Sequence, residues 1–255
     1  MSALRQATEL SLEGLNEDIE RFDDLGYLVV PGFLSQKEAK ELWETIDELQ
    51  RAEEHALVHE RILTHDERFL EVLQRPPMLA YAERLIGHDL QLLSLETVET
   101  LPGAGPVRAW HIDLAHFSGP PLIVNWLVYL QDMTDQAGPF CFVPGSHKWG
   151  RKPLPDEVGV PLPGEVKFST PAGGAILFHH NLWHSGSHNE RDVRRHVLFY
   201  YFGKYWLKRF DEFYRDPLPE RITESDDPLL RQLFGPGQRG PSIHGSVYSD
   251  RVSYS

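Results

Sequence analysis

The sequence has little of three things that point to particular classes of protein: cysteine, basic charge and long apolar runs. Among 255 residues there is one cysteine, Cys141, so no internal disulfide can form. Lys and Arg total 25 against 38 Asp and Glu, and a net charge of −13 disfavours nucleic acid and anionic membranes as partners. The most apolar run, Leu122 to Leu130, is too short to span a membrane. We therefore expect a soluble, cytoplasmic protein.

Apolar side chains, in contrast, are abundant enough for a large core. They make up 41% of the chain, and aromatic residues make up 11%, which is typical of a globular protein. The N-terminal third predicts mainly helix. A short strand is expected over residues 26–33, then a helix over 39–49 that starts at the capping-box pair Ser35 and Glu38, then a second helix over 79–86.

After residue 89 the pattern changes to short runs of Leu, Val, Thr, Tyr and Phe separated by Pro and Gly. Such runs predict strands, which we expect over residues 90–101, 122–131, 139–143, 165–169, 174–180 and 195–203. No helical stretch of a dozen residues separates them, which disfavours parallel βαβ units and favours an antiparallel barrel or jelly roll. A short helix is expected from Pro228 to Phe234, ended by Gly235.

These patterns predict one mainly β domain of the α+β class over residues 1–255, since barrels and sandwiches commonly reach this length. The expected division is an N-terminal extension, a mostly helical support, a jelly-roll core, and a C-terminal region that contacts substrate or acts as a lid: residues 1–21, 22–89, 90–203 and 204–255. The last twenty residues are rich in Gly, Ser and Arg, and we expect this tail to be docked.

Spacing separates candidate metal ligands from the other histidines, of which the chain has 13 in all. A histidine followed two residues later by a carboxylate occurs three times, as His65/Glu67, His111/Asp113 and His188/Glu190. Residues i and i+2 point to the same side in an extended chain but diverge on a helix. Because the pair at 65 lies in a helical pattern and the pair at 111 follows a strand-like stretch, we predict His111 and Asp113 as metal ligands.

A third ligand is expected after the run at 174–178, which brings His179, His180 and His184 to one turn region. We choose His184, and His179, His180 and His188 stay open as alternatives. Two imidazoles and one carboxylate leave other positions on the ion open, as in oxygen-activating ferrous sites. A closed structural zinc site would need more sulfur than one cysteine provides.

Polar residues on two predicted strands are candidates for binding a co-substrate. Arg195 shares one strand face with apolar residues, and a guanidinium there is costly unless it meets an anion such as a dicarboxylic co-substrate. The alternative is an ordinary ion pair with Asp192 or another acid. Asn125 and Tyr129 share one face of another strand, where they could meet co-substrate or bond to neighbouring strands.

Several separate segments resemble the phytanoyl-CoA dioxygenase family of iron(II)/2-oxoglutarate oxygenases. They are the opening FDDLGYLVVPGF, the motif WHID, the turn VPGSH and the motif LWH, followed eleven positions later by an arginine, at residues 22–33, 110–113, 143–147, 182–184 and 195. The resemblance covers roughly residues 22 to 203. It implies a double-stranded β-helix, Fe(II) held by His111, Asp113 and His184, and Arg195 as partner of the distal carboxylate of 2-oxoglutarate, with O2 as the other co-substrate.

One position departs from the pattern of that family, which usually has Ser or Thr two residues after the distal histidine. Here that residue is Gly186, and Ser187 is our candidate for the hydroxyl that assists Arg195, although which hydroxyl does so stays open. Related halogenases replace the metal-binding Asp by a small residue, so Asp113 disfavours halogenation. We expect a monomer or homodimer that hydroxylates a small molecule and releases succinate and CO2. The alternatives are a non-redox, cupin-like isomerase or binding protein, and an oxygenase that modifies proteins.

Overall fold

The computed structural model describes residues 12–52, 58–59, 66–105, 108–117, 119–208 and 220–235. Its N-terminal part is mostly helical, as expected, and contains α1 (Leu12–Leu25), β1 (Tyr27–Val30), α2 (Gln36–Ala52), β2 (Val58–His59), α4 (Arg68–Leu73) and α5 (Pro76–Ile86). Helix α1 was not predicted, because most of its residues are polar. Its apolar side chains Leu15 and Ile19 pack against the core. His65 and the C-terminal tail lie outside the described residues.

Helix α2 begins at the predicted capping box. The Glu38 carboxylate accepts a hydrogen bond from the Ser35 backbone N–H at 2.8 Å, and the Ser35 hydroxyl accepts one from the Glu38 N–H at 3.2 Å. Two N–H groups that the first turn of a helix leaves without partners are satisfied in this way.

The rest of the chain forms two antiparallel sheets. It contains β3 (Leu90–Thr100), β4 (Ile123–Tyr129), β5 (Cys141–Phe142), η1 (Ser146–Trp149), β6 (Val166–Lys167), β7 (Ala175–His179), β8 (His184–Ser185), β9 (Arg195–Lys204), α6 (Glu220–Thr223) and α7 (Pro228–Phe234). The large sheet has the order β1-β7-β4-β9-β3-β2, and the small sheet has the order β6-β5-β8. Every pairing among the described strands is antiparallel, as predicted.

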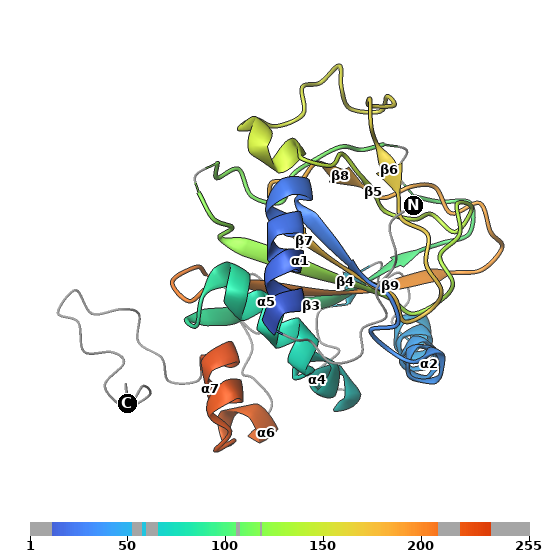
Figure 1. Ribbon diagram of the computed structural model, residues 1–255. Helices are drawn as coiled ribbons and strands as arrows, with labels where there is room; N and C mark the ends of the chain where they lie inside the picture. Colours follow the sequence, from blue (N-terminus) through green and yellow to red (C-terminus); the bar gives the residue numbers. More distant parts are fainter. Residues whose placement is uncertain are drawn as a thin grey trace.

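The two faces of the large sheet have different neighbours (Figure 1). Alternate residues such as Trp126, Leu177 and Tyr200 point to the outer face and pack with the helices in one apolar cluster. The residues between them, such as Leu127 and Phe199, point inward. They pack with Phe140 and Phe142, which lie just before and within β5 of the small sheet. Because strand side chains alternate between faces, this parity decides which residues can reach the space between the sheets.

Two expectations about the whole chain can be set beside this architecture. The division into a single domain with four regions stays a prediction, and of its C-terminal region only residues 204–208 and 220–235 are described. Among the described helices none is both long and apolar enough to cross a membrane.

At Gly173, just before β7, the backbone lies close to Leu34 in the loop that follows β1. Its φ is +88°, and a Cβ there would lie 2.1 Å from the carbonyl oxygen of Leu34. We expect Gly173→Ala to lower the free energy of unfolding by about 2 kcal/mol or more, because backbone strain and a backbone clash add together. Gly32→Ala is the matched control, since Gly32 also has a positive φ, +62°, but has open space around it. Urea unfolding of both variants is the measurement, and equal losses would contradict the expectation.

Candidate active site

A short extended segment, residues 111–113, lies antiparallel to the chain that leads into β8. The backbone N–H of His111 donates to the carbonyl of His184 at 3.1 Å, and the N–H of His184 donates back at 3.1 Å. Two residues further along, the Asp113 N–H donates to the His180 carbonyl at 2.9 Å. This pairing sets His111 directly opposite His184, and their ring centroids are 4.2 Å apart.

Three side chains converge at this pairing. One ligand atom each from His111, Asp113 and His184 lies within 4.8 Å of the other two, and this is the one such cluster found among the described residues. The His184 Nε2 and the Asp113 Oδ1 are 3.4 Å apart. Ligand atoms at about 2.1 Å from a shared ion, at right angles, would be about 3 Å apart. The three predicted ligands are therefore arranged to hold one metal ion.

Backbone carbonyls orient both imidazoles. The Nδ1 of His111 lies 2.8 Å from the carbonyl oxygen of Ala109, and the Nδ1 of His184 lies 2.9 Å from that of Leu182. A carbonyl oxygen only accepts, so each Nδ1 carries a proton, and Nε2 is the nitrogen that can bind a metal. The two histidines are thus held in the ring orientation that metal ligation through Nε2 requires.

The charges of the site favour a carboxylate at Asp113. Burial favours its neutral form, but the positive charge of His184 and the contact between the two groups outweigh burial and hold the pKa of Asp113 below its ordinary value. Burial likewise opposes a charge on His184, yet Asp113 raises the pKa of His184. Burial and the neighbouring His184 lower the pKa of His111. Bound metal would displace the proton from His184 and take its place beside Asp113.

The structure places the competing histidines elsewhere. Both ring nitrogens of His180 face backbone carbonyls, those of Ile123 at 3.0 Å and His116 at 3.2 Å. His179 accepts a hydrogen bond from the backbone N–H of Asn181, and it follows Phe178, which points inward, so it faces the opposite side of β7 from the metal cluster. His188 is not part of the cluster. The geometry therefore favours His184.

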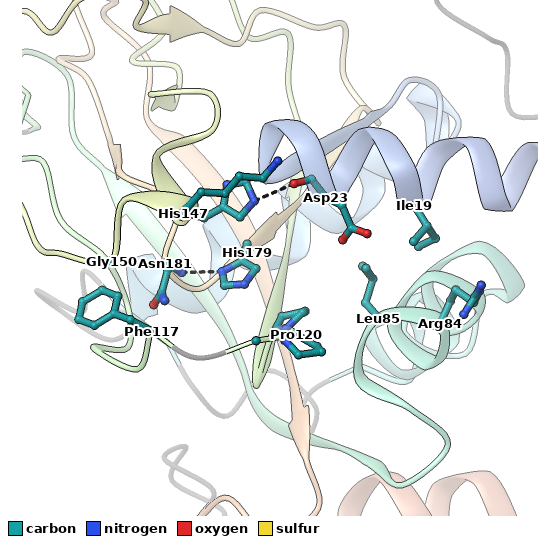
Figure 2. Close-up of a pocket in the computed structure, with 13 residues that line it drawn as sticks. Ile19, Asp23, Arg84, Leu85, Phe117, Pro120, His147, Gly150, His179 and Asn181 are labelled. Carbon is teal, nitrogen blue, oxygen red and sulfur yellow. Dashed lines mark hydrogen bonds between the residues drawn. The ribbon is translucent and has the colours of Figure 1, made fainter.

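His179 lines a cavity of about 590 Å³ on the side of β7 that the helices cover. Figure 2 shows it between helix α1, helix α5 and the loop that carries Phe117 and Pro120. His147, in the VPGSH turn, also lines it, and its Nε2 lies 3.1 Å from the Asp23 carbonyl. None of the three candidate metal ligands lines this cavity.

Arg195 begins β9, and its guanidinium is buried, at 3% exposure. It donates to the carbonyl of Gly138 and, at 2.5 Å, to the hydroxyl of Thr100. Within the described residues no carboxylate pairs with it, and its Nε has no hydrogen-bond partner. Burial lowers the pKa of Arg195, and only Tyr129 opposes this effect. A buried cation whose described partners are all neutral is well suited to receive an anion.

The other predicted co-substrate residues have described partners of their own. The Asn125 amide donates to Asp113 Oδ2. The Tyr129 hydroxyl accepts from the Phe140 N–H at 3.0 Å, and the Ser187 hydroxyl donates to the Pro139 carbonyl. Sequence reasoning missed Thr100, whose hydroxyl is the one that meets Arg195. Thr100 could have been found only from the pairing of β3 with β9, which sets it opposite Arg195. That pairing could be predicted only if the register between two strands far apart in sequence were known.

The family to which this chain belongs follows from its sequence as a whole. A sequence model of the family described as Phytanoyl-CoA dioxygenase (PhyH) matches residues 22–197, a span that holds the metal cluster and Arg195. The chain belongs to the phytanoyl-CoA dioxygenase family. The resemblance in the separate motifs is thereby confirmed.

Relatives within and around this family are oxygenases by name. The chain is 28% identical to the L-proline trans-4-hydroxylase of Streptomyces griseoviridis, over 70% of this chain and 82% of that protein. It is also 28% identical to Dioxygenase af480 of Aspergillus fumigatus, over 71% of this chain but 59% of the relative.

Solved structures of similar fold confirm the predicted jelly roll. One is the non-heme alpha ketoglutarate dependent epimerase SnoN from nogalamycin biosynthesis, with a TM-score of 0.61, 24% identity, and coverage of 76% of this chain and 82% of SnoN. Another is HygX from Streptomyces hygroscopicus with nickel and 2-oxoglutarate bound, with a TM-score of 0.63, 19% identity, and coverage of 76% of this chain and 88% of HygX. At these identities the likeness establishes the fold.

Membership in the family confirms the class of enzyme predicted from the sequence. The protein is a 2-oxoglutarate-dependent non-haem iron dioxygenase, and its cofactor and co-substrates are Fe(II), 2-oxoglutarate and O2. The described residues suit that chemistry, because the histidines present Nε2, Asp113 is held as a carboxylate, and Arg195 lies buried without an anion. The alternative of a non-redox, cupin-like protein is disfavoured.

Proposed function

We propose that this enzyme hydroxylates a small molecule, with His111, Asp113 and His184 as ligands of Fe(II) and Arg195 as partner of the distal carboxylate of 2-oxoglutarate. The observation that carries the assignment is the convergence of two imidazole nitrogens and one carboxylate oxygen within 4.8 Å. Two imidazoles and one carboxylate on one side of an iron ion leave its other positions open for co-substrate and O2. When bound, iron would activate O2, which is the oxidant; 2-oxoglutarate would give up two electrons as it is converted to succinate and CO2, and the substrate would give up the other two.

The residues of this chain bind and orient the reactants. Arg195 supplies a planar pair of donors at the far end of the inner face, where a carboxylate can be bound in bidentate fashion. The apolar inner face, which includes Leu127, Phe178 and Phe199, limits the access of water to the space between the sheets. Asp113 occupies the ligand position that a halide would need, which favours hydroxylation over halogenation.

The substrate class is inferred from the relatives. The hydroxylase of S. griseoviridis acts on L-proline by its name, and SnoN is by its title an epimerase of nogalamycin biosynthesis. We therefore infer a small metabolite as substrate, in the manner of secondary metabolism, rather than a protein. A cytoplasmic location belongs to the same proposal and is supported by the single cysteine, and a monomeric or homodimeric state is proposed with it.

Turnover of the co-substrate tests this function directly. The protein is loaded with Fe(II) without oxygen and then exposed to air with 2-oxoglutarate and a panel of small molecules that includes L-proline. We expect succinate to form only when Fe(II) and 2-oxoglutarate are both present, at a rate that one class of small molecule increases, with one oxygen atom added to that molecule. Conversion of a substrate without succinate would support the non-redox alternative and overturn the proposal.

Thr100 allows a specific test of the co-substrate site. We expect Thr100→Val to raise the KM for 2-oxoglutarate about 10-fold, because a hydrogen bond to a charged group contributes about 1.5–3 kcal/mol and part of that is lost when Arg195 is less well held. Thr100→Ser keeps the hydroxyl and should stay close to wild type. Ser187→Ala is the control, because the described partner of this hydroxyl is the Pro139 carbonyl. A larger effect at Ser187 than at Thr100 would contradict the expectation. Steady-state rates at varied 2-oxoglutarate give the values.

A further inference from the structure

Asn125 lies on β4, and its side chain contacts Asp113, one of the three candidate metal ligands. Its side chain is fully buried, at 0% exposure, on the inner face of the sheet. Its amide Nδ2 donates a hydrogen bond to Asp113 Oδ2, the oxygen of the carboxylate that does not face His184. The other oxygen, Oδ1, is the one that lies 3.4 Å from His184 Nε2. The two oxygens of Asp113 therefore have different partners.

We infer that Asn125 is a positioning residue that holds Asp113 as a one-oxygen ligand of the metal. This inference rests on the proposed metal site and adds a role for a residue outside it. A carboxylate can bind a metal through one oxygen or through both. If both oxygens of Asp113 bound, they would take a position that 2-oxoglutarate or O2 needs, because three protein atoms leave three positions in an octahedral site.

Asn125 is firmly placed for this role. It lies in the middle of the large sheet, where it pairs with Phe178 of β7 on one side and Tyr201 of β9 on the other. The backbone of Asp113 is fixed as well, through its hydrogen bond to the His180 carbonyl. Backbone pairing thus fixes where both residues lie, and the hydrogen bond between their side chains holds Oδ2 and leaves Oδ1 for the ion.

The hydrogen bonds of the amide argue against a merely structural role. Its Oδ1 is buried and has no hydrogen-bond partner among the described residues. A buried amide with one unsatisfied acceptor makes the folded protein less stable than an apolar side chain of the same size would. What Asn125 provides that leucine could not is a neutral donor to Asp113, and a neutral donor leaves the negative charge of the carboxylate available to the metal.

The experiment uses Co(II) as a spectroscopic probe in the metal-free full-length protein. Cobalt titrations give the affinity, and the intensity of the visible ligand-field bands reports the coordination number. We expect Asn125→Leu to bind Co(II) about 10- to 100-fold more weakly, which is the usual loss for a partner of a metal ligand. We also expect its bands to differ from wild type, and added 2-oxoglutarate to bind more weakly. Asn125→Thr, which keeps a donor, should recover part of each loss.

Two controls make the result decisive. Asn125→Asp has the same size but accepts instead of donating, so it should show the loss even if Asn125→Leu does not fold. Thr97→Val removes another buried polar group from the same sheet, on the face away from the metal, where Thr97 pairs with Leu198. Thr97→Val should leave Co(II) affinity and spectrum unchanged, and an equal loss in this variant would overturn the inference.

Failure of this inference can be told apart from failure of the metal site itself. If wild type binds Co(II) and 2-oxoglutarate but Asn125→Leu and Asn125→Asp match it in affinity and spectrum, the positioning role is wrong and the site stands. If wild type itself binds no Co(II), or binds it equally well without His184, the proposed site is wrong and the inference is overturned with it.

Discussion

Iron binding is expected to be lost in His184→Ala and retained in His179→Ala and His188→Ala, although the three histidines lie within ten residues of one another. The reason is that His184 pairs with His111 across the strand and presents Nε2 toward Asp113. His179 lines the cavity near α1 and α5, on the other side of β7. Loss of a direct ligand should weaken metal binding by more than the 10- to 100-fold typical of an outer partner.

Metal content and turnover measure this expectation together. Each variant is stripped of metal and titrated with Fe(II) under nitrogen, and succinate release is then followed in air. His184→Ala should give neither stoichiometric iron nor succinate above background. If His179→Ala or His188→Ala lost iron while His184→Ala retained it, the ligand assignment would be wrong, and the antiparallel pairing at His111 would have no functional meaning.

The second large effect is expected at Arg195. We expect Arg195→Leu to weaken 2-oxoglutarate binding by about 2–5 kcal/mol, because the buried end of the co-substrate would then hold an unpaired carboxylate. In affinity this is about 30-fold or more, at 1.4 kcal/mol for each factor of ten. Arg195→Lys should recover part of the loss, because it keeps the charge but not the planar fork.

The same variants should separate binding of co-substrate from binding of metal and from folding. Iron affinity should be unchanged in Arg195→Leu, since Arg195 is not part of the metal cluster. Thermal stability without co-substrate should be unchanged or higher, because leucine removes a buried cation that has no described anionic partner. The measurements are the KM for 2-oxoglutarate, the iron titration and thermal unfolding. An unchanged KM would show that the distal carboxylate binds elsewhere.

Local patterns in the sequence were sufficient for much of this protein. Strand composition, turn residues and the absence of helical connections predicted antiparallel strands from β3 to β9, since these signals act over a few residues. The pair Ser35 and Glu38 predicted the start of α2 for the same reason. Spacing in an extended chain predicted His111 and Asp113 as metal ligands, and the two lie in one cluster with His184. Helix α1 was not predicted, because it has few apolar residues and its stability depends on the core that it covers.

Tertiary structure decided what depends on pairing between distant segments. Residues 111–113 meet the chain before β8, which favours His184 among crowded histidines. The register of β3 with β9 brings Thr100 to Arg195, where the sequence had suggested Ser187. The parity of β4 directs Asn125 to Asp113. The sequence by itself determined the fold, and it predicted the types of ligand that the fold carries. Which side chains share one ion and one carboxylate depends on strand register, and a shift of one residue would turn each of them to the other face.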